Sequence, residues 1–286
     1  MARRKPVAAE GGRLSGKVAL IFGVGSVGPG FGNGRATAVL FAREGAKLHG
    51  TDIDPAAAEE TARLVRNEDG EIEIAACDVT DDAAIEAAVS ACVTRFGRID
   101  VLVNNVGGSV PGGPVELTTE AWQRQFATNI DYVFLACKHV IPVMQRQFKA
   151  DGSGGSIINL ASIAALRHFG PDVAAYAASK AGVIKFSQVT GVQYAAQKIR
   201  VNTIVPGLMN TPLVAARLAT ARADGDVEAL KRRRDAQVPM GHMGDGWDVA
   251  QAALFLASDE SRYVTATEIV VDGGLSAASR LPPESV

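Results

Sequence analysis

The sequence predicts an α/β fold in which one domain is built on a doubly wound, parallel, seven-stranded sheet flanked by helices. Short runs rich in Val, Ile and Leu alternate with stretches of helical periodicity along the chain. The apolar runs are continuous, which is typical of strands that helices cover on both faces. A Gly-rich turn, 23–34, joins the first run to the first helical stretch. Such turns in α/β proteins bind the phosphates of dinucleotides.

Each expected strand is a short apolar run. The strands are Val18–Phe22, Lys47–Asp52, Ile72–Cys77, Ile99–Asn104, Ser156–Leu160, Arg200–Val205 and Glu268–Val271. Helices are expected between them. Arg35–Glu44 has an apolar face and ends before Gly45, and Asp81–Phe96 ends in the same way before Gly97. The alternation of strands and helices predicts βαβ crossovers and therefore a parallel sheet.

Composition narrows the class of protein. The chain has 286 residues, of which 47% are hydrophobic and 21% charged, enough to bury a core. Its net charge of −2 argues against a nucleic-acid or membrane-surface partner. The three cysteines form no CxxC pair, so neither a disulfide framework nor a metal site is expected, and the cytoplasm is the expected location. No apolar run is long enough to span a membrane.

The domain organisation is expected to be simple. A disordered tail is predicted for 1–13, a folded domain for 14–275 and a second tail for 276–286. Within the domain, 208–247 is long and interrupts the strand rhythm, as a substrate lid or an ordinary surface excursion would. Its apolar residues, Leu213, Val214, Leu218, Leu230, Val238, Met240 and Met243, are compatible with an apolar substrate or with packing of the lid itself. Its basic run, Lys231–Arg234, is expected on a solvated helix face, with an anion site as the alternative.

The glycine-rich turn contains more glycines than the chemistry needs. Gly23 directly follows the first strand and allows a tight turn, while Gly32 and Gly34 run into the first helix. These three are the expected working set: Gly32 lets the backbone approach a diphosphate and Gly34 lets the helix pack closely on the strand. The enlarged loop Val24–Phe31 lies between them. Either it folds over the cofactor, with Ser26 and Asn33 as hydrogen-bonding side chains, or it is a benign insertion.

An acidic residue ends the second strand. Asp52 lies 18 residues beyond Gly34. A carboxylate at this position accepts hydrogen bonds from ribose hydroxyls and repels a 2′-phosphate, which favours NAD over NADP. Asp54 is the alternative, although Asp54-Pro55 is typical of a helix start.

A second chemical pattern lies downstream. Tyr176 and Lys180 are four residues apart and would share a helix face. A free tyrosine has a pKa of about 10, and a nearby ammonium lowers it by favouring the phenolate. Such a phenol exchanges a proton with an alcohol or carbonyl oxygen. Ser162, just past a strand, is placed to hydrogen-bond the same oxygen.

Together these motifs resemble those of the short-chain dehydrogenase/reductase superfamily, from about Leu14 to Leu275. The family's T-G-x-x-x-G-x-G corresponds to Phe22-Gly23, eight residues and then Gly32-Asn33-Gly34, so the Thr is absent and the loop is five residues longer. The spacing of 14 between Ser162 and Tyr176 is one residue longer than expected. The other matches are Asn104-Asn105-Val106-Gly107 for N-N-A-G, Asp78-Val79 for the adenine contact, Asn129 for the helix asparagine, and Pro206-Gly207 with Thr211 for P-G-x-x-x-T.

The resemblance implies a Rossmann-like fold and a role for each matched residue. Tyr176 would be the catalytic acid/base, Lys180 would lower its pKa and hold the nicotinamide ribose, and Ser162 would orient the substrate oxygen. Asn129 would support a water in the proton relay by bending its helix. The expected cofactor contacts are Gly23, Ser26, Gly32, Asn33, Gly34, Asp52, Asp78, Val79, Asn105, Val106, Gly107, Tyr176, Lys180, Pro206, Gly207 and Thr211.

The expected function is NAD-dependent interconversion of a secondary alcohol and a ketone. Two alternatives are an NADPH-dependent 3-oxoacyl-thioester reductase and a non-catalytic dinucleotide-binding scaffold.

The resemblance further implies a homotetramer. Apolar residues on more than one face of the helical regions 122–147 and 177–197 are compatible with subunit contacts, and equally with this subunit's own core; they are Val133, Phe134, Leu135, Val183, Ile184 and Phe186. In the loop after Ser162, Arg167 and His168 either face a polar substrate group or lie on the surface.

Overall fold

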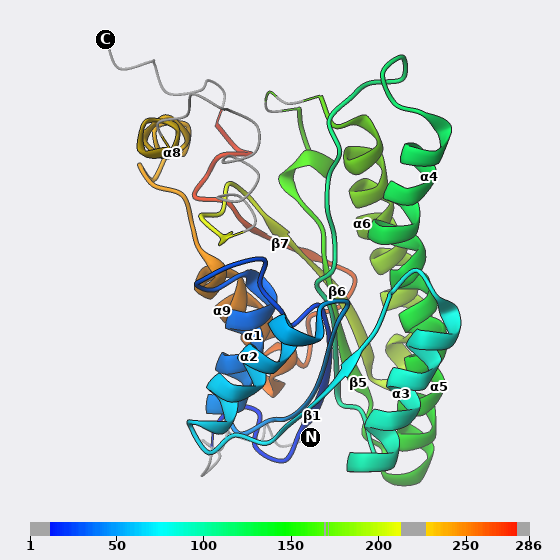
Figure 1. Cartoon of the computed structure of the whole chain (residues 1–286). Coiled ribbons are helices and arrows are strands. Elements are labelled where there is room, and N and C mark those ends of the chain that lie inside the picture. Colours follow the sequence, from blue (N-terminus) through cyan, green and yellow to red (C-terminus); the bar gives the residue numbers. More distant parts are fainter. Residues whose placement is uncertain (1–11, 169, 171, 213–226, 279–286) are drawn as a thin grey trace.

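Seven parallel strands form one sheet in the order β3-β2-β1-β4-β5-β6-β7 in the computed structural model, which describes residues 12–168, 170, 172–212 and 227–278 (Figure 1). The strands are β1 Val18–Phe22, β2 Lys47–Asp52, β3 Ile72–Ala76, β4 Val101–Asn104, β5 Gly155–Leu160, β6 Ile199–Pro206 and β7 Glu268–Val271. The predicted doubly wound, Rossmann-like α/β fold is therefore confirmed. From β1 the chain builds the sheet first toward β3 and then toward β7, so the strand order reverses between β1 and β4. Ligands of such sheets bind beyond the carboxyl ends of the strands at this reversal.

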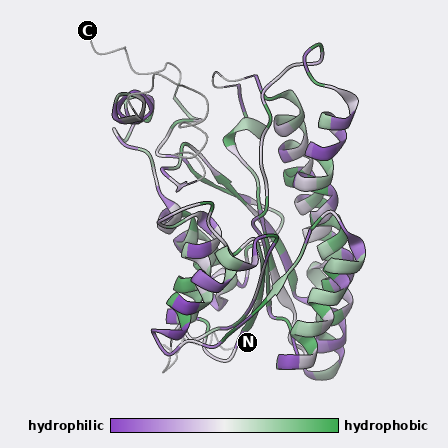
Figure 2. Cartoon of the chain, in the orientation of Figure 1, coloured by the Kyte–Doolittle hydropathy of each residue, from purple (hydrophilic) through white to green (hydrophobic). Residues whose placement is uncertain are grey.

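Helices cover both faces of the sheet (Figure 1). The main helices are α1 Asn33–Arg43, α2 Pro55–Arg66, α3 Asp82–Phe96, α4 Thr119–Phe126, α5 Tyr132–Asp151, α6 Ala174–Tyr194, α8 Val227–Asp235 and α9 Gly246–Ala257. One layer contains α1, α2 and α9, and the other contains α3, α5 and α6 (Figure 1). Each layer buries its own cluster of Val, Leu, Ile and Ala side chains against the sheet. Figure 2 shows the corresponding pattern, with hydrophilic residues on the outer sides of the helices.

Local sequence signals set most helix ends. Asp54 caps α2 through hydrogen bonds from the backbone N–H groups of Ala56 and Ala57, with Pro55 as the first helical residue. Asp81 caps α3, and Gly97 ends it with φ of 80°, a left-handed conformation that glycine adopts without strain. The predicted helix at Arg35–Glu44 is observed two residues earlier, as Asn33–Arg43, because Gly32 acts as its N-cap.

Several buried side chains in the described part of the sheet have polar atoms without a hydrogen-bond partner, and His49 is the titratable one. His49 lies in β2 with 4% of its surface exposed, and neither ring nitrogen has a partner among the described residues. Burial lowers the pKa of His49 because the charged imidazolium is desolvated there. The native protein therefore holds a neutral histidine where the unfolded chain protonates at a pKa of about 6.5.

We predict that the free energy of unfolding decreases as the pH falls below about 6.5, because the unfolded chain then binds a proton that native His49 does not. The slope is at most about 1.4 kcal/mol per pH unit. His49→Leu removes this proton uptake and two unpaired polar atoms, so the variant is expected to lose less stability between pH 6.5 and 5. Urea unfolding at several pH values measures this. Identical pH profiles for the variant and the wild type would contradict the prediction.

No helix in the described part of the chain has the length and apolar character needed to cross a lipid bilayer.

Candidate active site

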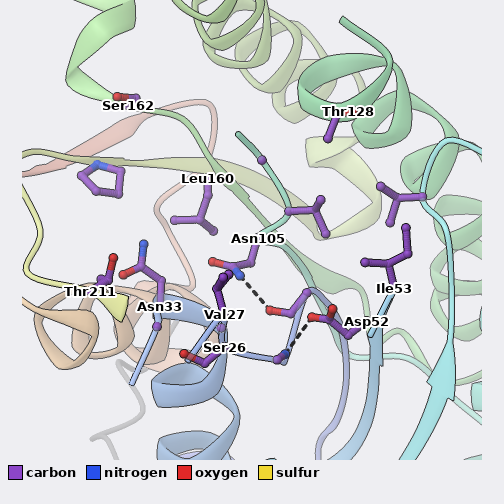
Figure 3. Close-up of a pocket in the computed structure, with 18 of the residues that line it drawn as sticks. Ser26, Val27, Asn33, Asp52, Ile53, Asn105, Thr128, Leu160, Ser162 and Thr211 are labelled. Carbon is purple, nitrogen blue, oxygen red and sulfur yellow. Dashed lines mark hydrogen bonds between the residues drawn. The ribbon is translucent and has the colours of Figure 1, made fainter. Parts of the chain in front are cut away.

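A pocket of about 640 Å³ lies at the carboxyl ends of the strands, at the reversal of strand order, and a smaller one of about 290 Å³ is lined by Arg167 and His168. The larger pocket brings together segments that are far apart in the sequence (Figure 3). Each of the predicted cofactor contacts lines it, from the glycine loop to Thr211, and so do Ser162, Tyr176 and Lys180. The exception among the predicted site residues is Asn129, which lies directly behind the pocket wall.

The first turn of α1 packs directly on the end of β1. A Cβ atom at Gly34 would lie 1.8 Å from the carbonyl oxygen of Gly23, so only glycine fits. Gly23 itself has φ of 87°, and its carbonyl accepts a hydrogen bond of 2.8 Å from the side chain of Asn105 (Figure 3). Gly32 is different, because a Cβ there would have its nearest neighbour at 3.6 Å. The protein therefore leaves room at Gly32, at the amino end of α1, where a helix favours an anion.

The enlarged loop between Gly23 and Gly32 is held by a buried arginine. Arg35 is 1% exposed, and its guanidinium donates to the carbonyl of Gly30 at 2.8 Å and to Oγ1 of Thr61 at 3.1 Å. Thr61 in turn donates to the carbonyl of Val24 at 2.8 Å. Val24 is fully buried in the core, so the first residue of the loop belongs to the fold and the remainder borders the pocket. Sequence reasoning missed Arg35, because its partners come from α2.

The outer side of the loop contacts both flanks of the predicted lid region. Phe31 packs on Trp247, with ring centroids 4.8 Å apart. A Cβ at Gly30 would lie 3.5 Å from Pro212. The lid residues Leu213, Val214 and Leu218 lie outside the described residues. In the described C-terminal part of the lid region, Val238 and Met243 are buried and Met240 is exposed.

Two side chains of the glycine loop have polar atoms without partners in the described part of the chain. They are Oγ of Ser26 and Oδ1 of Asn33, and both atoms are buried. Both residues line the pocket, and Figure 3 shows Asn33 beside Thr211. Buried polar atoms normally have a partner, so their position in the pocket wall indicates a polar ligand. The hydroxyl of Ser26 and the free space at Gly32 fit the diphosphate of a dinucleotide, whereas Oδ1 of Asn33 is an acceptor and fits a donor such as a ribose hydroxyl.

Asp52 lines the adenosine end of this pocket, beside Ile53 (Figure 3). Its Oδ2 accepts a hydrogen bond of 2.8 Å from the N–H of Gly25, and its Oδ1 accepts one of 3.1 Å from Asp54. A carboxylate oxygen has two lone pairs, so acceptor capacity remains for ribose hydroxyls. The side chain of Asp54 caps α2 through its Oδ1, and Asp54 is not among the residues that line the pocket, which favours Asp52.

The Tyr–Lys pair lies on α6, as its spacing predicts. Nζ of Lys180 is 6.0 Å from the centroid of the Tyr176 ring and donates to the carbonyl of Leu160 at 2.7 Å. Lys180 is 2% exposed, and burial lowers the pKa of its ammonium to about 7. A desolvated ammonium gains most from a nearby negative charge, and a phenolate is one. Ser162 lies across the pocket after β5, 9% exposed, where its Oγ accepts a hydrogen bond from the N–H of Ala164.

Asn129 occupies a π-helical turn, Ala127–Asp131, between α4 and α5. Its amide makes two hydrogen bonds with the backbone of Gly108, from Nδ2 to the carbonyl at 2.9 Å and to Oδ1 from the N–H at 3.0 Å. A Cβ at Gly107 would lie 2.9 Å from both Asn129 and Lys180. The π-turn interrupts the α-helical pattern between α4 and α5, and the asparagine holds the 107–108 backbone next to the lysine. A π-turn at this place is typical of functional sites.

The positions of three arginines add to what the sequence predicted for charged residues. Arg124 and Arg234 both line the pocket; Arg234 belongs to the basic run noted in the sequence, whereas nothing in the sequence pattern singled out Arg124. The basic run 231–234 is therefore not a wholly solvated face. Arg167 does not line the larger pocket: its Nη1 donates to the carbonyls of Leu275, Ser276 and Ala278. These bonds hold the start of the predicted C-terminal tail.

Comparisons with known proteins agree with this architecture. A family model described as "Enoyl-(Acyl carrier protein) reductase" matches residues 30–276. A 2,5-dichloro-2,5-cyclohexadiene-1,4-diol dehydrogenase of Sphingobium indicum is 38% identical over 92% of this chain and 98% of that protein. A crystal structure of a putative short-chain dehydrogenase/reductase from Burkholderia xenovorans is 52% identical, with a TM-score of 0.89 over 94% of this chain and 100% of that chain. A carveol dehydrogenase from Mycobacterium avium in complex with NAD is 30% identical, with a TM-score of 0.85 over 93% and 100%.

Proposed function

The chain belongs to the short-chain dehydrogenase/reductase superfamily, and we propose that it is an NAD-dependent oxidoreductase that interconverts a secondary alcohol and a ketone. The observation that carries the proposal is the convergence of Ser162, Tyr176 and Lys180 on one pocket with the glycine loop and Asp52. The pocket thus combines a proton-transfer group with a dinucleotide cradle. NAD, when bound, supplies the hydride acceptor, and the chain's own residues position it and handle the proton.

The proton is assigned to the phenol of Tyr176. In alcohol oxidation, the phenolate accepts the hydroxyl proton of the substrate while the adjacent ammonium of Lys180 stabilises the negative charge. Ser162 donates a hydrogen bond to the same substrate oxygen and fixes its orientation. Asn129 acts indirectly, from outside the pocket lining, because its two hydrogen bonds to Gly108 fix the backbone next to Lys180. Its expected role in a water relay stays a prediction.

The preference for NAD is assigned to Asp52. Its carboxylate borders the adenosine end of the pocket, where it would accept hydrogen bonds from a ribose and repel a 2′-phosphate. The N–H of Gly25 on its Oδ2 fixes the side chain in this position. The carveol dehydrogenase of similar fold was crystallised with NAD, which supports the same choice.

Two other functions are less well supported. An acyl-thioester reductase agrees with the description of the matching family model. If such an enzyme here used NADPH, the carboxylate of Asp52 would face the 2′-phosphate. A non-catalytic dinucleotide-binding scaffold has no chemical need for Tyr176 and Lys180 beside the nicotinamide end of the pocket.

We predict that the purified protein reduces NAD, and not NADP, with members of a panel of secondary alcohols, measured by absorbance of the reduced nicotinamide. Tyr176→Phe is expected to lower kcat by about 100-fold or more, because it removes the acid/base, and to leave the Kd for NADH unchanged. Turnover with NADP in place of NAD would contradict the role of Asp52 and favour the acyl-thioester reductase. NADH binding with no turnover of any alcohol or ketone would favour the scaffold.

The enlarged glycine loop is proposed to take part in cofactor binding. The support is the buried, unpartnered Oγ of Ser26 in the pocket wall and the anchoring of the loop by Arg35. The alternative, a benign insertion, makes no use of that hydroxyl.

Ser26→Ala is therefore expected to raise the Kd for NADH by roughly 3-fold to 10-fold, the effect of one hydrogen bond, with an unchanged unfolding midpoint. Titration of NADH fluorescence measures it. The matched control is Ser15→Ala, an exposed turn serine that does not line the pocket. A Kd equal to that of the wild type would support the benign insertion.

Assembly as a homotetramer in the cytoplasm is proposed from the family resemblance. Of the six apolar residues that the sequence offered for subunit contacts, Phe134 is the one with a largely exposed side chain, at 52%. Val133, Val183 and Ile184 are buried in this subunit, and Leu135 and Phe186 pack against its core. Val189 and Val192 on α6 are exposed instead, at 59% and 70%. Light scattering is expected to give four times the chain mass, and a monomer mass would contradict the proposal.

A further inference from the structure

Arg234 differs in its surroundings from Arg124, the other arginine among the lining residues of the pocket. It lies in the last turn of α8 and is half-buried. Its Nε donates to the sulfur of Met243 at 3.4 Å, which is a weak acceptor. Within the described ranges, no carboxylate lies within 4.0 Å of its guanidinium, and its two terminal nitrogens make no hydrogen bond. The neighbouring carboxylate of Asp235 is engaged with the N–H of Met243 at 2.7 Å.

The position of Arg234 is fixed by the segment that it touches. Met243 precedes Gly244, which forms a parallel bridge with Met209, and the carbonyl of Gly244 accepts a hydrogen bond of 2.7 Å from Asn210. Arg234 therefore lies on the wall of the pocket that Met209 and Thr211 form. Two residues further along, Gly246 packs against the carbonyls of Phe31 and Gly32. This wall borders the amino end of α1, where an anion is favoured.

The energetics of such an arginine point to an anionic ligand. Burial lowers the pKa of Arg234 because water is removed from the guanidinium. A desolvated charge without a partner is costly, and a planar guanidinium recovers that cost best by paired hydrogen bonds to a carboxylate or phosphate. A role in stabilising the end of α8 explains the charge at this position. It does not explain why a guanidinium that lines the pocket has no oxygen acceptor among the described residues.

We propose that Arg234 binds an oxyanion in the active-site pocket, an inference that rests on the proposed function. Two sources offer this chemistry. One is the diphosphate of the cofactor, for which the amino end of α1 supplies N–H groups, while the charged side chain there, Arg35, is engaged with Gly30 and Thr61. The other is a carboxylate of the substrate, which would make the substrate a hydroxy acid or an oxo acid. The guanidinium serves either one, and the two sources predict different effects of the same substitution.

The experiment compares Arg234→Gln with Arg234→Lys, and uses Arg233→Gln as the control, because Arg233 is the adjacent exposed arginine of the same helix. The first arm measures the Kd of ADP-ribose and of NADH. The second arm measures binding of 2-, 3- and 4-oxo acids and of their methyl esters to the NADH-loaded protein. An effect of at least about tenfold is expected in one arm for Arg234→Gln, with partial rescue by Arg234→Lys and none for Arg233→Gln.

Each outcome has one meaning. A tenfold weaker binding of ADP-ribose and NADH assigns Arg234 to the cofactor diphosphate. Unchanged ADP-ribose binding, together with loss of the preference for an acid over its ester, assigns Arg234 to a substrate carboxylate. If Arg234→Gln changes neither, the inference is overturned while the proposed function stands. If the wild-type protein binds neither NADH nor ADP-ribose, the proposed function itself is overturned, and the inference with it.

Discussion

The contact between Gly34 and the carbonyl of Gly23 is the constraint on which the rest of the site depends. A Cβ at Gly34 would be 1.8 Å from that oxygen, so α1 approaches β1 more closely than any other residue would permit. This approach places the amino end of α1 at the reversal of strand order. Asn105, directly after β4, donates a hydrogen bond to the carbonyl of Gly23. This bond joins the glycine loop to the β4 side of the pocket. The close packing of one helix on one strand therefore sets the geometry of the whole cofactor end.

The loop that closes this contact is longer than the family motif, and the structure shows how the extra length is accommodated. Buried polar groups hold it from beneath: Arg35 and Thr61 bind the carbonyls of Gly30 and Val24. Aromatic packing of Phe31 on Trp247 holds it from outside. An insertion of this kind costs little chain entropy, since the cost grows slowly with length, and the anchoring contacts offset it. The loop is thus part of the fold and also part of the pocket wall.

Three cations line the pocket without a carboxylate partner in the described residues; Arg124 is exposed, whereas Lys180 and Arg234 are buried or half-buried. Lys180 is buried beside Tyr176 with a carbonyl as its acceptor, and Arg234 faces the pocket with only a thioether. Each is a desolvated charge, which folding alone would not select. In the roles proposed for these two side chains, a negative group offsets this desolvation cost: a phenolate at Lys180 and an oxyanion at Arg234.

By itself the sequence determined the features that depend on near neighbours in the chain. Continuous apolar runs specified the parallel strands, glycines marked the tight turns, and Asp54-Pro55 specified a helix start, because backbone propensity and capping act within a few residues. The Tyr176–Lys180 pair was visible for the same reason. Only the tertiary structure decided which charges meet the pocket. Arg35, Arg167 and Arg234 look alike in sequence, yet one holds a loop, one binds the C-terminal segment and one faces the active site. Their roles follow from partners distant in the chain, and contacts of that kind leave no periodic pattern in the sequence.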